Sequence, residues 1–369
     1  MDKFVYIYYL ILAVMLVWGA KMMKRGEWNE DALSLDQTKA LLGFAEIVII
    51  FHHCSHKTSA NWLPAEQIHH GLDFFVSIGY LCVALFFFCS GYGMYISMKK
   101  KPEFFKGFFS RRILRIIVPT VFMWLVCFIT ERARGINVDK PVWINVCTHL
   151  WFIYALIYAY LVFFICFKLI KNEKASFIVL WTGLVLYIIL AMIFSPGSWW
   201  YNTIHLFGVG IVFAKNQGKR IDSFKKKYLL RLSVMLIIFA ISYALYKYNS
   251  EILGLFKLGY NDTVYLIGQM ISAYAIVMIV IMISMKIKIG NKLLSILGAM
   301  TLEIYVIHPF FVELFSFEFI KSGAEPFLYI ENVFLYVTAV LFFTLVPAYF
   351  MNKLGVLIKK RGNDRYEEK

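Results

Sequence analysis

The sequence predicts an all-α polytopic membrane protein with about eleven transmembrane helices. Hydrophobic residues make up 60% of its 369 positions, and charged residues make up 17%. The apolar residues come in blocks of roughly 17–25, the length at which a helix crosses about 30 Å of hydrocarbon. Because backbone polar groups in lipid must be satisfied within their own segment, each block is expected to be a helix. The loops are too short for a soluble catalytic domain, so any chemistry is expected within the helical bundle.

The predicted spans follow one another along the whole chain. In order, they are 4–20, 40–55, 72–97, 113–130, 147–167, 176–195, 199–214, 229–246, 263–285, 293–315 and 328–350. Lys21, Lys24 and Arg25 follow the first span, whereas a signal peptide carries its positive charge before the apolar run. The first span is therefore interpreted as an uncleaved anchor. The seventh is short and begins with aromatic residues typical of a membrane interface, starting at Trp199.

The basic residues are distributed unevenly between the two sets of loops. When alternate loops are assigned to opposite sides, most of the 38 Lys and Arg residues fall on one side. They lie in 21–39, 97–115, 168–174, 215–231, 286–292 and 351–369. This positive-inside pattern predicts an outside N-terminus and a cytoplasmic C-terminus. The net charge of +15 is thus a topology signal, with membrane lipids and not nucleic acid as the expected partner.

Ionisable side chains inside the spans are costly to bury and mark candidate functional sites. Glu46 and His53 lie in the second span, with Glu46 two turns before His53 on the same helix face. His149, His205 and His308 come from three other spans, and the topology puts all four histidines in the outer half of the bilayer. Two interpretations stay open: hydrogen bonds between helices, or proton transfer by imidazole.

A cluster of histidines at the end of the second span raises the question of a metal. His52 and His56 share a helix face, His53 lies between them, and His69 and His70 follow. No carboxylate or cysteine completes a ligand set at a familiar spacing, and the cluster sits at the water interface. The sequence therefore predicts no metal and no bound cofactor.

The cytoplasmic side carries arginines at the start of the fourth span. Arg111, Arg112 and Arg115 follow a run of lysines. Arg112 and Arg115 are three residues apart on one helix face, a geometry suited to binding phosphates. The alternative is a stop-transfer cluster, which explains the lysines better than it explains arginines entering a helix.

Five segments, in order along the chain, resemble the motifs of the membrane acyltransferase-3 family. They are the first core helix at 43–53, the FF-x-x-SG helix at 83–92, the arginine-rich segment at 111–119, the H-x-W-[FY]-L signature at 149–153 and the late IY-x-x-HP helix at 302–309. The resemblance covers 35–355, an acyltransferase-3-like membrane domain with no fused extracytoplasmic domain. The segment 1–34 is then an extra N-terminal helix with a basic loop, and 356–369 is a charged cytoplasmic tail.

The resemblance implies an integral membrane O-acyltransferase. Such a protein moves an acyl group, most often acetyl, from cytosolic acetyl-CoA (acyl-CoA) to a hydroxyl of a cell-surface or extracellular polysaccharide. The expected partners are the acyl-CoA donor, a glycan or lipid-linked glycan acceptor and membrane lipids, in the plasma (inner) membrane of a bacterial cell. A homodimer stays open.

The resemblance also assigns roles to residues near His53. It implies that His53 is the histidine of the first core helix, acting as a general base or as a transient acyl carrier. Glu46 is expected to orient or charge-balance this imidazole, with pairing to a neighbouring helix as the alternative. Ser90 and Tyr92 are expected to donate hydrogen bonds to the developing oxyanion, with close helix packing at their glycine neighbours as the alternative.

The donor and acceptor sides are assigned in the same way. Arg111, Arg112 and Arg115 are expected to bind the donor phosphates. The family's basic residue eleven positions before the histidine falls on Leu42, which departs from the pattern, and Lys39, nearly one turn earlier, is the substitute. The residues expected on the acceptor side are His149, Trp151, Tyr305 and His308.

Two rival functions stay open on the sequence alone. Buried His and Glu residues also suit the proton relay of a transporter or flippase for a glycolipid or small acid, although no internal inverted repeat is present. The departure at Leu42 favours a non-catalytic scaffold of an envelope-assembly complex.

Overall fold

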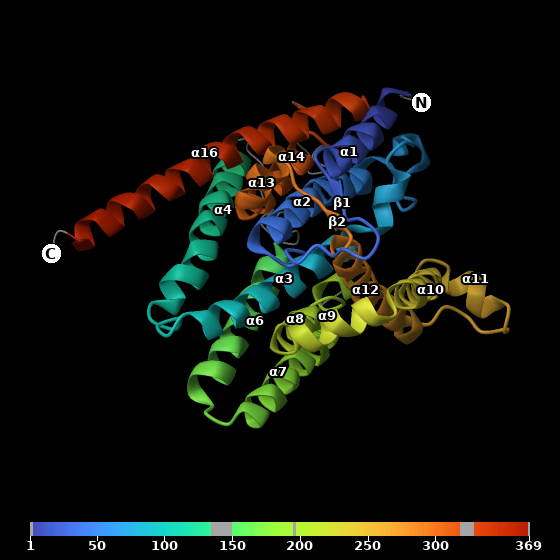
Figure 1. Ribbon diagram of the computed structural model, residues 1–369. Helices are drawn as coiled ribbons and strands as arrows, with labels where there is room; N and C mark the ends of the chain where they lie inside the picture. The colour runs from blue at the N-terminus through green and yellow to red at the C-terminus, as the bar shows by residue number, and fades with distance from the viewer. Residues whose placement is uncertain (1–2, 134–149, 195–196, 318–327, 368–369) are drawn as a thin grey trace.

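The computed structural model describes residues 3–133, 150–194, 197–317 and 328–367, and within these it confirms the predicted all-α class. The helices of the first half are η1 (Lys3–Tyr6), α1 (Ile7–Val17), α2 (Leu35–Thr58), α3 (Gly79–Lys100), α4 (Arg115–Ala133), α6 (Trp151–Phe164) and α7 (Glu173–Phe194). Those of the second half are α8 (His205–Lys215), α9 (Gln217–Lys226), α10 (Tyr228–Lys247), α11 (Asn249–Gly254), α12 (Asp262–Ser284), α13 (Lys292–Ala299), α14 (Thr301–Leu314) and α16 (Val333–Glu367). Figure 1 shows α2 near the centre of the bundle, with α16 running along the outside.

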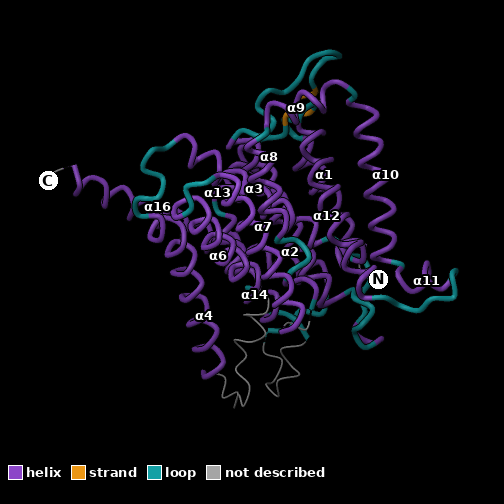
Figure 2. The backbone as a smooth tube through the Cα atoms, turned by 90° about the horizontal axis from the view of Figure 1, so that it is seen from below, coloured by secondary structure: helices purple, strands orange, loops and turns teal. Residues whose placement is uncertain are grey.

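Seven described segments are long and apolar enough to cross a membrane. They are Gly79–Lys100, Phe109–Thr130, Trp151–Leu169, Glu173–Phe194, Tyr228–Lys247, Asp262–Ser284 and Val333–Leu357. Each coincides with a predicted span. Both α7 and α10 leave large apolar side chains such as Ile178 and Ile237 exposed, as lipid-facing helices do. Figure 2 shows α10 standing at one edge of the bundle and α4 at the opposite edge.

The predicted span at 293–315 is interrupted by a bend. The segment consists of α13 and α14, which meet at a bend of 77° next to Met300, so the pair adds an eighth span if it crosses as one unit. The side chain of Asn291 accepts a hydrogen bond from the backbone N–H of Leu294 and caps the start of α13. The bend lets α13 cross α2 while α14 continues beside it.

The three remaining predicted spans do not meet the same length and composition criteria. The segment Lys3–Val17 is apolar but short, and α8 has only 11 residues. The 24 residues of α2 extend about 36 Å at the helical rise, which is long enough. Its mean hydropathy is reduced by Glu46 and by three histidines near its end. Eleven spans are therefore not reached on these criteria within the described residues, because two segments are too short and polar side chains lower the mean hydropathy of α2.

Glycines permit the closest helix crossings. A Cβ atom on Gly91 of α3 would overlap the carbonyl oxygen of Phe207 on α8, and one on Gly210 of α8 would overlap the carbonyl oxygen of Phe88. At the crossing of α2 and α13, a Cβ on Gly298 would overlap the backbone of Lys39. Such contact between backbones is how helices pack tightly in a membrane without relying on hydrophobic attraction.

The N-terminal segment is tied to the rest of the bundle by hydrogen bonds. The Tyr8 hydroxyl donates to the carbonyl oxygen of Phe334 on α16 at 2.9 Å, and the Tyr9 hydroxyl donates to that of Gly71 at 2.9 Å. The two-residue strands β1 (Lys21–Met22) and β2 (Ile287–Lys288) pair antiparallel. Residues before 35 are therefore an integral part of the packed structure.

The substitution Gly91→Ala is expected to destabilise the protein by about 1–3 kcal/mol, because the new methyl group forces α3 and α8 apart. The matched control is Gly93→Ala, two residues further along α3, where a Cβ meets nothing within 4 Å. Thermal unfolding of both variants in the same detergent is the measurement. Equal melting temperatures for the two variants would contradict this account of the crossing.

Candidate functional site at the junction of helices α2 and α14

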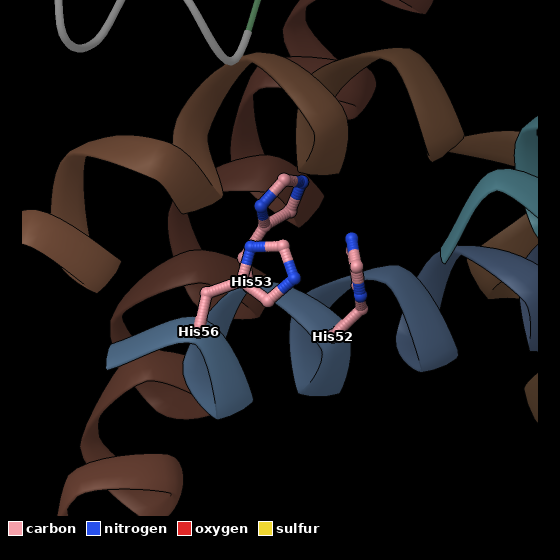
Figure 3. A group of neighbouring side chains, drawn as sticks. All are labelled: His52, His53 and His56. Carbon is pink, nitrogen blue, oxygen red and sulfur yellow. The ribbon is translucent and has the colours of Figure 1, made fainter. Parts of the chain in front are cut away.

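Three imidazoles gather near the end of α2. The ring centroids of His52 and His56 lie 4.1 Å apart, those of His52 and His53 5.1 Å, and those of His53 and His56 6.2 Å. Figure 3 shows the three rings on one side of the α2 ribbon. Sequence spacing predicted the shared face of His52 and His56, but His53 also turns toward them.

The loop before α3 fixes two of these rings. His52 Nδ1 donates to the carbonyl oxygen of Phe75 at 2.8 Å, and His56 Nε2 donates to that of Val76 at 3.0 Å. A carbonyl oxygen only accepts, so each of these two nitrogens carries a proton. At Gly79, the first residue of α3, any Cβ would overlap the His52 ring, so glycine is needed there.

Helix α14 brings a fourth imidazole to His53. The ring centroids of His53 and His308 are 5.2 Å apart, and His308 Nδ1 donates to the carbonyl oxygen of Ile304 at 3.0 Å. Glu46 Oε1 lies 3.9 Å from the same Nδ1. Both Glu46 and His53 thus approach His308, as their predicted shared face requires.

The Glu46 carboxyl group is completely enclosed, with 0% of the residue exposed. Its two oxygens have no hydrogen-bond partner among the described residues. The sequence interpretation directed this carboxyl group at His53. In the structure, its Oε1 atom lies 3.9 Å from Nδ1 of His308. This geometry matches the other option considered from sequence, in which Glu46 interacts with a neighbouring helix.

Aromatic residues enclose His308 from the side of α6. The Tyr305 ring centroid lies 5.7 Å from that of His308 and 5.3 Å from that of Phe152. Trp151 is buried next to Phe152 and approaches Trp200, with ring centroids 6.5 Å apart. His308 therefore lies beside His53, Tyr305 lies beside His308, and Trp151 lies next to Phe152 on α6.

The other predicted histidines are placed differently. His149 lies outside the described residues. His205, on α8, hydrogen-bonds the backbone of Met270 on α12, away from the cluster on α2. His70 Nδ1 is 2.7 Å from Asp73 Oδ1 in an exposed pair, which fits its interpretation as an interface residue. Of the four histidines predicted to meet in the outer half, the structure brings His53 and His308 together.

A partly buried ion pair beside the cluster was missed by sequence reasoning. Lys57 Nζ lies 2.8 Å from Glu313 Oε1, and their side chains are 10% and 11% exposed. The pair joins α2 to α14 one turn beyond His53. Because a residue further along α2 contacts a residue further along α14, the two helices run in the same direction. The only sequence signal was an opposite charge near the end of each helix.

The arginines form a second polar group on a different part of the bundle. Arg111 donates to the carbonyl oxygens of Glu103, Phe104 and Lys106, so its guanidinium closes the preceding loop. Arg112 stacks over the Phe104 ring, 5.7 Å from its centroid. The arginines stand at a π-helical turn, Phe109–Leu114, a local geometry frequent at functional sites.

The buried phenol of Tyr160 on α6 connects these arginines to α3. It lies within Coulomb range of Arg112 and Arg115 and beside the hydroxyl of Ser90. The positive charges of Arg112 and Arg115 both act on this phenol, and Arg115 itself is exposed.

The structure does not bring Ser90 and Tyr92 to His53. Gly79 meets His52, and Ser90 lies about 16 Å further along α3 at the helical rise. The Tyr92 hydroxyl donates to Gln217 Oε1 at 2.9 Å, at the α8–α9 turn. Their expected role as oxyanion donors for His53 is therefore wrong, because eleven residues of helix separate the two levels.

Lys39 and Leu42 lie in the first half of α2. Lys39 is about 20 Å before His52 along the helix, where its backbone meets Gly298 of α13. Leu42 lines an apolar cavity of about 10 Å³ together with Leu85 and Cys89, which is room for about one water molecule. The position that carries a basic residue in the family pattern thus faces a small apolar gap here.

Two chemically different ends result. One offers imidazoles and a buried carboxyl group, which can move a proton or carry a transferred group. The other offers guanidinium groups, which can bind phosphate. Along α3, Gly79 at the first end and Ser90 near the second are about 16 Å apart at the helical rise.

Comparison with known proteins gives one match. Residues 35–353 match a family model described as an acyltransferase domain. The matched range begins at α2 and includes both polar ends. No curated protein and no solved structure matches the chain.

The substitution Glu313→Gln is expected to destabilise the protein by about 3–5 kcal/mol, because it leaves the Lys57 ammonium largely buried without its carboxylate. An exposed carboxylate at the start of α16 provides the control, Glu331→Gln, which should change little. Thermal unfolding measures both, and the double variant Lys57→Met/Glu313→Gln should recover part of the loss. If the single and double variants are equally destabilised, the ion pair does not hold α2 to α14.

Proposed function

The chain belongs to the acyltransferase 3 family, and on that premise we propose that this membrane acyltransferase moves acetyl from cytosolic acetyl-CoA to a hydroxyl of a surface polysaccharide. The observation that supports the proposal is the distance along α3 between Gly79, which meets His52, and Ser90, which lies beside Tyr160 near the charges of Arg112 and Arg115; it is about 16 Å at the helical rise. An extended pantetheine arm is comparable in length. One donor molecule can therefore have its phosphates at Arg112 and Arg115 while its thioester reaches His53.

At the donor end, Arg112 and Arg115 bind the phosphates of the donor. The positive charges of both arginines act on Tyr160, and Ser90 lies beside that phenol. Arg111 acts indirectly, because its Nη2 group donates to carbonyl oxygens of the preceding loop. Lys39 supplies further positive charge, in place of the basic residue that Leu42 replaces.

At the imidazole end, His53 acts as the general base. It removes the proton from the acceptor hydroxyl, whose oxygen then attacks the thioester carbonyl carbon. The carbon–sulfur bond breaks, the CoA thiolate leaves, and the proton held by His53 passes to the sulfur. A transient acyl-His53 followed by attack of the hydroxyl is the other route with the same balance.

His308 and Glu46 position His53 in this proposal. The His308 Nδ1 proton points to Ile304, and the Glu46 carboxyl group stands 3.9 Å from that nitrogen. A carboxyl group near Nδ1 favours the tautomer with its proton on that atom, which fixes the His308 ring against His53. Tyr305 and Trp151 form the wall along which the acceptor enters.

The positive-inside pattern supports the orientation that this chemistry needs. With α1, α2 and α8 crossing alongside the segments that meet the criteria, the N-terminus is outside and the C-terminus is cytoplasmic. The arginines then face the cytosol, where acyl-CoA is made, and His53 faces the surface glycan. The setting is the plasma membrane of a bacterial cell.

Replacing His53 with alanine is expected to reduce acyl transfer by on the order of 10²–10⁴-fold, since that is the usual contribution of a general base. The control is His70→Ala, an exposed histidine engaged with Asp73. Acetylation of the surface glycan is measured by NMR in cells that produce equal amounts of each protein in the membrane. Wild-type acetylation by the His53→Ala variant would refute the base assignment.

Donor binding is tested with Arg112→Ala and Arg115→Ala. Each is expected to weaken CoA binding at least about tenfold, because a charge-assisted hydrogen bond contributes about 1.5–3 kcal/mol. The matched control is Arg132→Ala on the same helix, where the guanidinium stacks over Phe128 at the other end. Calorimetry at two salt concentrations measures the affinity, and salt should weaken wild-type binding more than that of either variant. Equal affinity in all four proteins would remove the phosphate site.

A further inference from the structure

The cluster of His52, His53 and His56 has the geometry of a ligand set for a metal ion. Each residue offers one ring nitrogen, and the three nitrogens all lie within 4.8 Å of one another. They come from two turns of one helix, so their relative positions are set by α2 itself. Sequence reasoning looked for a carboxylate or cysteine to complete the set, but three imidazoles are sufficient for a site with an open position.

Hydrogen bonds on the far side of two rings strengthen this assignment. Metal-ligating histidines almost always donate their other ring N–H to a carbonyl or carboxylate. His52 does so through Nδ1 to Phe75, and His56 does so through Nε2 to Val76. In the neutral rings, His52 Nε2 and His56 Nδ1 are then the atoms with a lone pair, which is the form that a metal requires.

The required adjustment is small. In a tetrahedral site with metal–nitrogen distances of 2.0–2.1 Å, the ligand nitrogens lie about 3.4 Å from one another. Small rotations of the three side chains bring the nitrogens from within 4.8 Å to that separation.

We propose that His52, His53 and His56 bind one Zn²⁺ ion at the end of α2, with the fourth position open. Imidazole ligands suit Zn²⁺, and a filled d shell tolerates the geometry that one helix imposes. The bound ion uses the lone pair of His53. This consequence rests on the proposed function, in which His53 is the general base. A bound Zn²⁺ ion occupies the lone pair that His53 needs to accept a proton, so the ion acts as an inhibitor at the acceptor side.

The test is a Zn²⁺ titration of the full chain, purified without a polyhistidine tag and held in lipid nanodiscs. Calorimetry should give one ion per chain. Replacement of a ligand in His52→Ala or His56→Ala should weaken binding at least about tenfold, the lower limit for loss even of a supporting residue. His70→Ala is the matched control and should bind as the wild type does, and Co²⁺ should give the strong visible absorption of a tetrahedral site.

Folding is controlled separately, because the His52 ring fills the space against Gly79. The variant His56→Asn leaves that contact untouched, and only variants that elute and melt like the wild type are compared. Absence of Zn²⁺ binding by the wild type overturns the proposal, as does binding unchanged in both ligand variants. Since binding is measured without acyl-CoA, it is independent of whether the chain transfers acetyl; in the transfer assay, inhibition of the His56→Ala variant should need at least tenfold more Zn²⁺.

Discussion

Everything in this structure depends on keeping a polar helix inside an apolar bundle. Helix α2 carries a fully buried carboxyl group and three imidazoles, groups that are costly in hydrocarbon unless other polar groups meet them. The surrounding elements meet part of this cost. The loop before α3 offers two carbonyl oxygens to the histidines, and Glu313 meets Lys57 at 2.8 Å. Helix α14 brings His308 Nδ1 to 3.9 Å from Glu46, whose oxygens have no hydrogen-bond partner among the described residues. The same polarity that makes α2 a poor membrane span by composition makes it the centre of the site.

Close backbone contact is what allows these partners to reach α2. The broken pair α13–α14 lies across and then alongside α2, and a side chain at Gly298 would push the pair away at Lys39. A straight helix through this segment would have either the crossing or the parallel contact, but not both. The 77° bend therefore allows α13 to pack across one end of α2 while α14 places His308 near the other end. Close backbone contact at Gly298, far from the histidines, thus helps to determine where His308 lies.

Sequence reasoning predicted the parts of this arrangement that depend on periodicity. The face shared by Glu46 and His53 follows from helix geometry, and the seven confirmed spans follow from the length and composition of the apolar blocks. What it missed depends on how helices lie against one another. Ser90 belongs to a motif next to the family's histidine in sequence order, yet α3 runs about 16 Å from the level of His52 before reaching it. The use of Arg111 by loop carbonyls and the partnership of Lys57 with Glu313 are likewise tertiary facts, which no spacing rule contains.

The imidazole cluster also depends on the N-terminal helix α1, which precedes the matched family domain. Phe75, whose carbonyl oxygen accepts from His52, packs its ring between Phe51 at 5.1 Å and Tyr9 at 5.2 Å. Tyr9 in turn donates its hydroxyl proton to Gly71 in the same loop. Because the loop sets the tautomer of His52 through a single carbonyl, a shift of the loop would change which nitrogen that ring presents to its neighbours. Helix α1 precedes the matched domain, yet it packs against the loop that holds His52. It therefore supports the imidazole cluster that we propose takes part in acyl transfer.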